Sequence, residues 1–217
     1  MFISTHQILD WMKVAIFGDI NGQYEWLDRL FDQSGRYNID IYSCHGDIAR
    51  KACKHDPEKT MRCIYFMKEK NVQCLRGNHE ENIIKHPKAG EEDIVAFFSS
   101  LPRKLVFDDL ELMISHYSPK GRMLIKPEPD EFDCLESMSP VRIAVFGHSH
   151  IRFHHSRTDK ITANYHPRFD VPYDVSTGLH LINTGTANFA FPFSFNLFPG
   201  YVIYDSDTKE IIFKKIK

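Results

Sequence analysis

Residues that can bind metal ions or transfer protons follow directly after several apolar runs of this chain. The run that ends at Leu75 is followed by an arginine, a glycine and then Asn78, His79 and Glu80. Four other apolar runs end in the same way, and the residues after them are Asp19, Asp47, His116 and the pair His148 and His150. In open α/β sheets, ligands collect outside the carboxyl ends of the strands. The pattern therefore predicts one site built from five strand ends.

The donor atoms at these strand ends suit two divalent ions that act on a phosphoester. Water attacks a phosphoester poorly at neutral pH, because its pKa is about 15.7 and the phosphate oxygens repel an anion. Two ions about 3.5 to 4 Å apart generate hydroxide and neutralise the phosphoryl oxygens. Such a pair needs a bridging carboxylate with nitrogen and oxygen ligands from several strands, which this set supplies.

Each of these residues has a plainer explanation when taken alone. A single Gly-Asp usually marks a turn, and a single buried histidine is usually a hydrogen-bonded core residue. The ordered coincidence at five strand ends favours the metal site. His148 and His150 lie two residues apart after a strand, so both rings could face one site. The remaining candidates have no such support and are expected to be solvated loop histidines: His154, His155, His166 and His180.

These motifs occur in an order that resembles the calcineurin-like metallophosphoesterase superfamily, from Gly18-Asp19 to His150. The chain looks more similar to the small phosphodiesterase and phosphatase branch than to the serine/threonine phosphatases. Those phosphatases have Asp-Arg-Gly after their bridging aspartate, whereas Asp47 is followed by an isoleucine, an alanine and Arg50. The resemblance implies an α/β fold, a four-layer α-β-β-α sandwich with two mixed β-sheets flanked by helices. We expect one metallophosphoesterase domain over residues 1–217.

The resemblance also implies a role for each residue at the strand ends. Asp47 would bridge two divalent ions. Asp19, Asn21 and His150 would belong to the first ion, and Asn78, His116 and His148 to the second. His79 would bind neither ion, but would face the phosphate and protonate the leaving oxygen. Glu80 or Asp19 would orient its ring, and Arg50 could contact phosphate.

Residue 21 departs from the family pattern, because the usual Asp-x-His reads Asp19-Ile20-Asn21 here. A carboxamide oxygen is a poorer ligand than imidazole for Zn²⁺, Fe or Ni²⁺. The first metal site is therefore expected to be weak. It would favour Mn²⁺ or Mg²⁺, fill only with substrate, or be repaired by His45. As cofactors we expect two divalent ions, with Mn²⁺ first and Fe, Zn, Ni or Mg as alternatives.

Composition restricts the class of protein. The chain has 217 residues, 42% of them hydrophobic and 26% charged, and a net charge of −2, which argues against non-specific nucleic-acid binding. The five cysteines form no Cys-x-x-Cys pair and favour a reducing cytoplasm. No apolar run approaches the length of a membrane span, and the N-terminus lacks the pattern of a signal peptide.

The periodicity predicts which elements position the site. Helical spacing follows the first strand up to Ser34-Gly35, and a second helix begins near Asp56-Pro57. Two hairpins are expected, over 105–115 and 201–215. Residues 152–178 are polar and contain two prolines, which indicates a long loop. Phenylalanines alternate from Phe189 to Phe198, which fits a buried strand face, a homodimer contact or a wall beside the site.

The sequence therefore predicts a phosphoesterase that hydrolyses a monoester or diester by attack of a metal-bound hydroxide. The alternative is a non-catalytic or weakly catalytic protein-binding scaffold on the same fold, as in the retromer subunit that resembles these enzymes. Retention of His79 with the ligand-type residues favours the enzyme. Asn21 and the phenylalanine run keep the scaffold open, because a fold alone does not fix a function.

Overall fold

Two mixed β-sheets form the centre of the molecule. The computed structural model describes residues 11–50, 55–126, 128–187 and 198–217. The first sheet has the order β3 (Gln73–Cys74), β2 (Ile41–Cys44), β1 (Lys13–Phe17), β11 (Gly200–Asp205), β12 (Glu210–Lys215) and β9 (Pro172–Asp174). The second has the order β4 (Lys104–Phe107), β5 (Leu112–Ser115), β6 (Ile143–Phe146), β10 (Leu179–Asn183), β7 (Phe153–Arg157) and β8 (Ile161–Tyr165). Strands β3, β2 and β1 run parallel, as do β5, β6 and β10, and the other neighbours are antiparallel.

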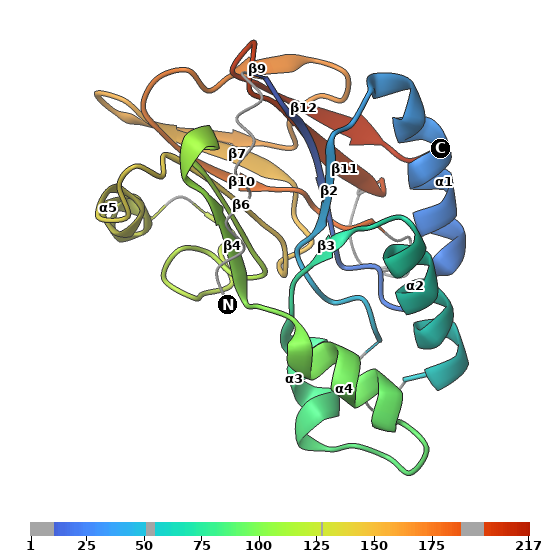
Figure 1. Cartoon of the computed structure of the whole chain (residues 1–217). Coiled ribbons are helices and arrows are strands. Elements are labelled where there is room, and N and C mark those ends of the chain that lie inside the picture. Colours follow the sequence, from blue (N-terminus) through green and yellow to red (C-terminus); the bar gives the residue numbers. More distant parts are fainter. Residues whose placement is uncertain (1–10, 51–54, 127, 188–197) are drawn as a thin grey trace.

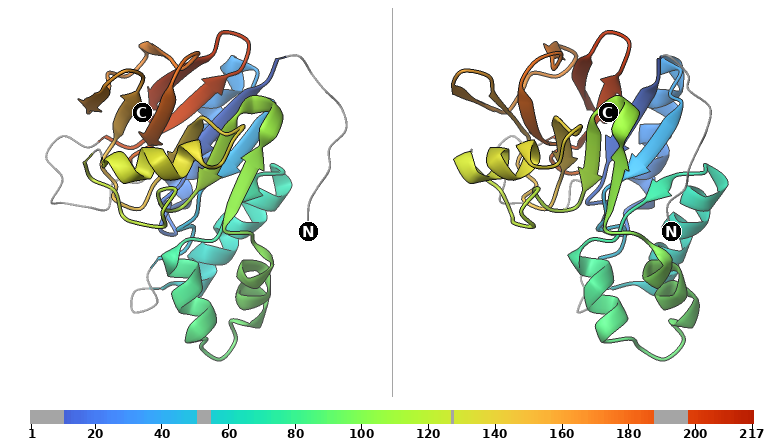
Figure 2. Two further views of the ribbon diagram at one scale, coloured as in Figure 1. Left: turned by 90° about the vertical axis from the view of Figure 1, so that its left-hand side faces the viewer. Right: turned by 60° about the vertical axis from the view of Figure 1, so that its left-hand side comes forward.

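Helices cover the outer faces of both sheets. Helices α1 (Tyr24–Ser34) and α2 (Pro57–Glu69) pack on the first sheet. Helices α3 (Asn78–Lys85) and α4 (Glu92–Ser100) come next in the chain and contribute to the same hydrophobic core. Helix α5 (Pro129–Glu136) lies on the opposite side of the molecule, against the second sheet (Figure 1, Figure 2). The predicted four-layer α-β-β-α sandwich is confirmed.

Strand β1 is apolar at consecutive positions because both of its faces are covered. In β1, Val14 and Ile16 face the other sheet, while Ala15 and Phe17 face the helices. Parallel strands buried in this way are apolar at consecutive positions rather than at alternate ones. All four of these side chains are fully buried. The run therefore fixes the position of β1 and, with it, the residues at its carboxyl end.

The helix boundaries agree with the sequence signals. Helix α1 buries Leu27 and Leu30 and ends at Ser34, with Gly35 as its C-cap. Asp56 caps α2, because its Oδ1 accepts the backbone N–H of Lys59 at 3.1 Å. The two predicted hairpins form as β4 with β5 and β11 with β12.

The prediction of a long loop over 152–178 was wrong, since β7, β8 and β9 lie in it. Strand β8 is an edge strand with exposed side chains, which makes a polar sequence compatible with a strand. The histidine expectations were wrong for three residues: His154, His155 and His180 are buried in β7 and β10, and His154 Nε2 lies 3.0 Å from His180 Nδ1. His166 is exposed, as expected.

Some expectations concern residues outside the described ranges. The phenylalanine run lies there except for Phe198, which is exposed. The described cysteines, Cys44, Cys63, Cys74 and Cys134, are free thiols. Of the helices in the described ranges, none has the length and apolarity needed to cross a membrane.

Candidate metal centre

The carboxyl ends of β1 and β2 hold the two aspartates side by side. The strands are in parallel register, with Phe17 opposite Cys44. Past the strands, the backbone N–H of Asp19 donates to Gly46 O and that of Asn21 donates to Asp47 O, each at 2.9 Å. Backbone hydrogen bonds thus continue the alignment beyond the sheet. The two loops therefore present Asp19 and Asp47 at the same edge.

Four donor atoms converge where β2, α3, β5 and β6 meet. His116 Nε2 lies 2.8 Å from Asn78 Oδ1, 3.1 Å from His148 Nδ1 and 3.5 Å from Asp47 Oδ1. A neutral imidazole carries at most one proton on Nε2, so it cannot satisfy three acceptors. A cation would satisfy all of these lone pairs at once. We name Asp47, Asn78, His116 and His148 the second group; Asp47, His116 and His148 alone already form a cluster able to hold a metal ion.

The other ligand candidates lie around Asp19. Asp19 Oδ1 is 3.1 Å from His150 Nε2, and Asp19 Oδ2 accepts the backbone N–H of His148 at 3.2 Å. We name Asp19 and His150 the first group. Asn21 is nearby, but its Nδ2 donates to the backbone oxygen of Asp19 at 2.9 Å. The side-chain amide of Asn21 is thus hydrogen-bonded to the backbone of its own turn.

The electrostatics of the site suit a cation. Asp19 and Asp47 are almost completely buried. Burial, then the nearby Glu80 and Asp19, raise the pKa of Asp47 well above its usual value. Burial would also raise the pKa of Asp19, but the hydrogen bond and charge of His150 hold it well below the usual value. Burial lowers the pKa of His116 to about 3, so its ring is neutral and carries a lone pair at physiological pH.

The backbone at the site adopts an uncommon conformation. Five non-glycine residues of the two groups and their loops have φ between 52° and 67°, in the left-handed region: Asp19, Asn21, Asp47, His148 and His150. Such residues are uncommon, and they cluster at functional sites. The conformation bends each loop back across the end of its strand. Four of the five, Asp19, Asp47, His148 and His150, belong to the two groups.

Glycines are required here by close approach. A Cβ on Gly77 would lie 2.3 Å from Asp47 Oδ1, and one on Gly147 would lie 2.5 Å from Asp19 Oδ2. Neither contact is sterically allowed. These glycines let the acidic side chains lie directly on the neighbouring backbone.

His79 has a different setting from the ligand candidates. Its Nδ1 lies 3.1 Å from Ala49 O and 3.4 Å from Asp47 Oδ2, and its backbone N–H donates to Asp47 Oδ1 at 3.0 Å. Ala49 and Asp47 therefore orient the ring. Glu80, which the sequence suggested for this role, bonds backbone N–H groups instead.

Glu80 instead fastens the loop after β2 to the start of α3. One oxygen accepts the backbone N–H groups of Asp47 and Gly77, both at 2.8 Å, and the other accepts that of Ala49 at 2.9 Å. The side chain is fully buried. It therefore fixes the backbone on which Asp47 and His79 stand. The sequence carried one signal for this, since glutamate at the third position of a helix commonly bonds the backbone of its N-cap.

Glu80→Gln is expected to lower the free energy of unfolding by about 1 to 3 kcal/mol, because the carboxamide NH₂ must face a backbone donor and leave it unpaired. Urea unfolding of metal-free protein measures this. Glu81→Gln is the control, because Glu81 is partly exposed and pairs with Arg103 at 3.0 Å. A change no larger for Glu80 than for Glu81 would contradict the fastening role.

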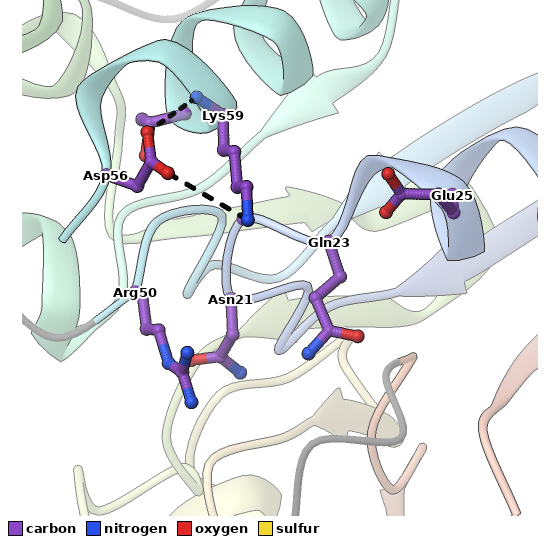
Figure 3. A pocket seen from close by; sticks show the side chains of 8 residues that line it. Asn21, Gln23, Glu25, Arg50, Asp56 and Lys59 are labelled. Carbon is purple, nitrogen blue, oxygen red and sulfur yellow. Dashed lines mark hydrogen bonds and ion pairs between the residues drawn. The ribbon is translucent and has the colours of Figure 1, made fainter. Parts of the chain in front are cut away.

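A polar cavity of about 290 Å³ adjoins the site between the starts of α1 and α2. Asn21, Gln23, Arg50 and Lys59 contribute to its lining, and Figure 3 shows Asn21 and Arg50 extending in the same direction. Lys59 is engaged by Asp56, with Nζ 3.9 Å from Oδ2. Within the described ranges Arg50 forms no ion pair. It is therefore available to an anionic group.

The family model of the calcineurin-like phosphoesterases matches residues 12–152, a span that runs from the start of β1 through His148 and His150. Among curated proteins, none matches the chain.

Solved structures resemble the whole fold. A metallophosphoesterase from Sphaerobacter thermophilus has a TM-score of 0.77 at 18% identity, over 95% of this chain and 88% of that one. An archaeal phosphodiesterase has a TM-score of 0.54 at 15% identity, over 94% and 99%. Vacuolar Protein Sorting 29 from Cryptosporidium parvum has a TM-score of 0.52 at 18% identity, over 90% and 85%. At these identities the similarity concerns the fold alone.

Proposed function

Because the chain belongs to the calcineurin-like phosphoesterase family, we propose that it is a phosphoesterase that works with two divalent ions. One observation carries the proposal: the lone pairs of His116, His148, Asn78 and Asp47 converge within 3.5 Å of a single imidazole nitrogen. The first group, Asp19 and His150, stands at the same edge. Asp47 is proposed as the carboxylate that serves both groups.

The residues around the groups would divide the work of hydrolysis. Divalent ions bound there would lower the pKa of the attacking water and neutralise phosphoryl oxygens. Donation of Nδ1–H of His79 to Ala49 O leaves Nε2 of the ring for the substrate. We propose that His79 acts from this position as an imidazolium, which keeps its Nδ1–H on Ala49 O and gives its Nε2 proton to the leaving oxygen. Glu80 keeps His79 and Asp47 in a fixed relation through the backbone.

The mixed donor set of imidazoles, carboxylates and a carboxamide suits Mn²⁺, which we propose as the first choice of metal. Fe, Zn, Ni and Mg are the alternatives to be compared. We leave the substrate as a monoester or a diester. The cavity beside Asn21 would receive the part of the substrate next to the scissile phosphate.

Arg50→Ala is expected to raise KM about 10- to 100-fold with a smaller change in kcat, because a charge that contacts bound phosphate contributes about 1.5 to 3 kcal/mol when it forms hydrogen bonds to the anion. Steady-state kinetics with a generic phosphoester measures this. Lys59→Ala is the matched control, since Lys59 lines the same cavity but is engaged by Asp56. Equal effects of the two substitutions would argue against a specific contact by Arg50.

A protein-binding scaffold with little or no catalysis is the alternative function. The observation in its favour is Asn21, whose amide is bonded to the backbone of its own turn rather than to either group. A homodimer through the Phe189 to Phe198 segment remains a separate hypothesis, because this segment lies almost wholly outside the described residues.

Hydrolysis by refilled protein tests the proposal. Metal-free protein would be refilled separately with Mn²⁺, Mg²⁺, Ni²⁺ and Zn²⁺ and assayed with generic mono- and diester substrates. We expect turnover with at least Mn²⁺. Silence with every metal, in protein shown to be folded by circular dichroism and to bind the ions, would favour the scaffold.

A further inference from the structure

His45 occupies a slot that the two sheets open for it. Its ring is completely buried between the end of β1 and the end of β6. A Cβ on Gly18 would lie 2.2 Å from His45 Cε1, and one on Gly147 would lie 2.0 Å from the same atom. Only glycine at both positions leaves room for the imidazole. The fold therefore places this ring beside Asp19, at the base of the first group.

The hydrogen bonds of the slot favour one tautomer of His45. Its Nε2 lies 2.8 Å from Thr184 Oγ1. The hydroxyl of Thr184 donates its one proton to Gly185 O at 3.3 Å. With that bond formed, Thr184 Oγ1 accepts from His45, which puts the proton on Nε2 and leaves a lone pair on Nδ1.

That lone pair faces an anion. His45 Nδ1 lies 4.0 Å from Asp19 Oδ2 and has no hydrogen-bond partner among the described residues. A buried acceptor without a donor is unfavourable, and a neighbouring carboxylate makes it more so. A cation that binds both atoms would remove the conflict. Two ligand atoms that each lie about 2.1 Å from one ion are about 3.4 Å apart in a tetrahedral site, so a shared ion would draw the Asp19 carboxylate slightly toward His45.

Position 21 does not compete for this role. The amide nitrogen of Asn21 is bonded to Asp19 O, and the side chain lines the cavity beside Arg50 (Figure 3). The first group thus has nearby one ring nitrogen without a hydrogen-bond partner among the described residues, His45 Nδ1, and one amide that has a partner, that of Asn21.

We infer that His45 supplies, through Nδ1, the imidazole ligand that Asn21 does not provide, so that Asp19, His150 and His45 hold the first ion with Asp47. The inference rests on the proposed two-ion function. It assigns the missing imidazole to a different loop, the one after β2. It also frees position 21 to shape the cavity.

Mn²⁺ and Ni²⁺ binding tests the inference without reference to activity. The wild type, His45→Gln, Asn21→His and the double variant would be titrated by calorimetry, and bound metal would be counted by elemental analysis. We expect two ions in the wild type. His45→Gln should weaken one of them by at least about 10-fold, the lower bound for partners of metal ligands, and leave the other within about twofold.

The double variant distinguishes a ligand from a packing residue. If His45 donates the imidazole, adding Asn21→His to His45→Gln restores most of the lost affinity, with a larger gain for Ni²⁺ than for Mn²⁺. In the wild-type background the same substitution should change the affinity much less. His86→Gln is the control, because His86 is exposed at the end of α3.

Each remaining outcome has a defined meaning. Unchanged affinity in His45→Gln, or a loss that Asn21→His does not restore, overturns the inference. If His45→Gln does not fold, Thr184→Val replaces it, because loss of the Nε2 acceptor lets Nδ1 take the proton; first-ion affinity should fall, and unchanged affinity overturns the inference. A wild type that binds neither ion overturns the proposed function itself.

Discussion

His79→Ala is expected to lower turnover by about 10²- to 10⁴-fold while both ions are retained. This is the usual contribution of a general acid. The ring is partly exposed, with 16% of its side-chain surface accessible, and is oriented by Ala49 O and by Asp47 Oδ2. The backbone N–H that bonds Asp47 survives the substitution. The variant should therefore lose catalytic turnover while it retains both metal ions.

Turnover and metal content of the His79 variant would be measured on the same preparation. The general-acid role predicts a further result. A substrate with a good leaving group needs little protonation, so the variant should lose less activity on it than on a substrate with a poor leaving group. His86→Ala is the control on the same helix. Loss of an ion from the His79 variant would show that His79 is a ligand and that the assignment is wrong.

Asp47→Asn is expected to empty both ion sites and to reduce turnover by about 10³-fold or more, since the ions supply several kcal/mol of transition-state stabilisation. Asparagine has the same shape and can still accept the N–H of His79, so the fold should survive. It lacks the negative charge that offsets the repulsion between two cations. Asn78→Ala should remove one ligand of one ion only.

Elemental analysis after dialysis gives the metal content of both variants. Asp40→Asn is a control at the opposite end of β2, where Asp40 Oδ2 accepts the N–H of Lys13 at 2.8 Å. Full retention of one ion in the Asp47 variant would mean that Asp47 does not bridge.

The sequence predicted the parts of this structure in which local pattern and tertiary environment agree. The apolar runs before Asp19, Asp47, His116 and His148 became buried strands because both of their faces are covered. The carboxyl ends of parallel strands meet at one edge, so the candidate ligands could be grouped before their contacts were known. Their individual roles in binding and catalysis remain predictions.

The failures have physical causes. Strands β8 and β9 each lie at the edge of a sheet, where polar side chains are tolerated, and edge position is a property of the sheet rather than of the segment. The hydrogen bonds of Glu80 connect residues up to 33 positions apart in the sequence. The hydrogen bond between His45 and Thr184 connects residues 139 positions apart. No local pattern contains such separations. The sequence contains Gly18 and Gly147, but it does not indicate that the ring of His45 packs between them.

The left-handed backbone at Asp19, Asn21, Asp47, His148 and His150 has a consequence for the evolution of the protein. A non-glycine residue in this conformation lowers the free energy of unfolding by about 1 kcal/mol or more. The five positions together therefore make the fold less stable than it could be. Glycine would remove this local cost at each position, but at Asp19 and Asp47 it would also remove side-chain hydrogen bonds. Selection for heat resistance alone would therefore act against this conformation at the candidate ligands and at Asn21.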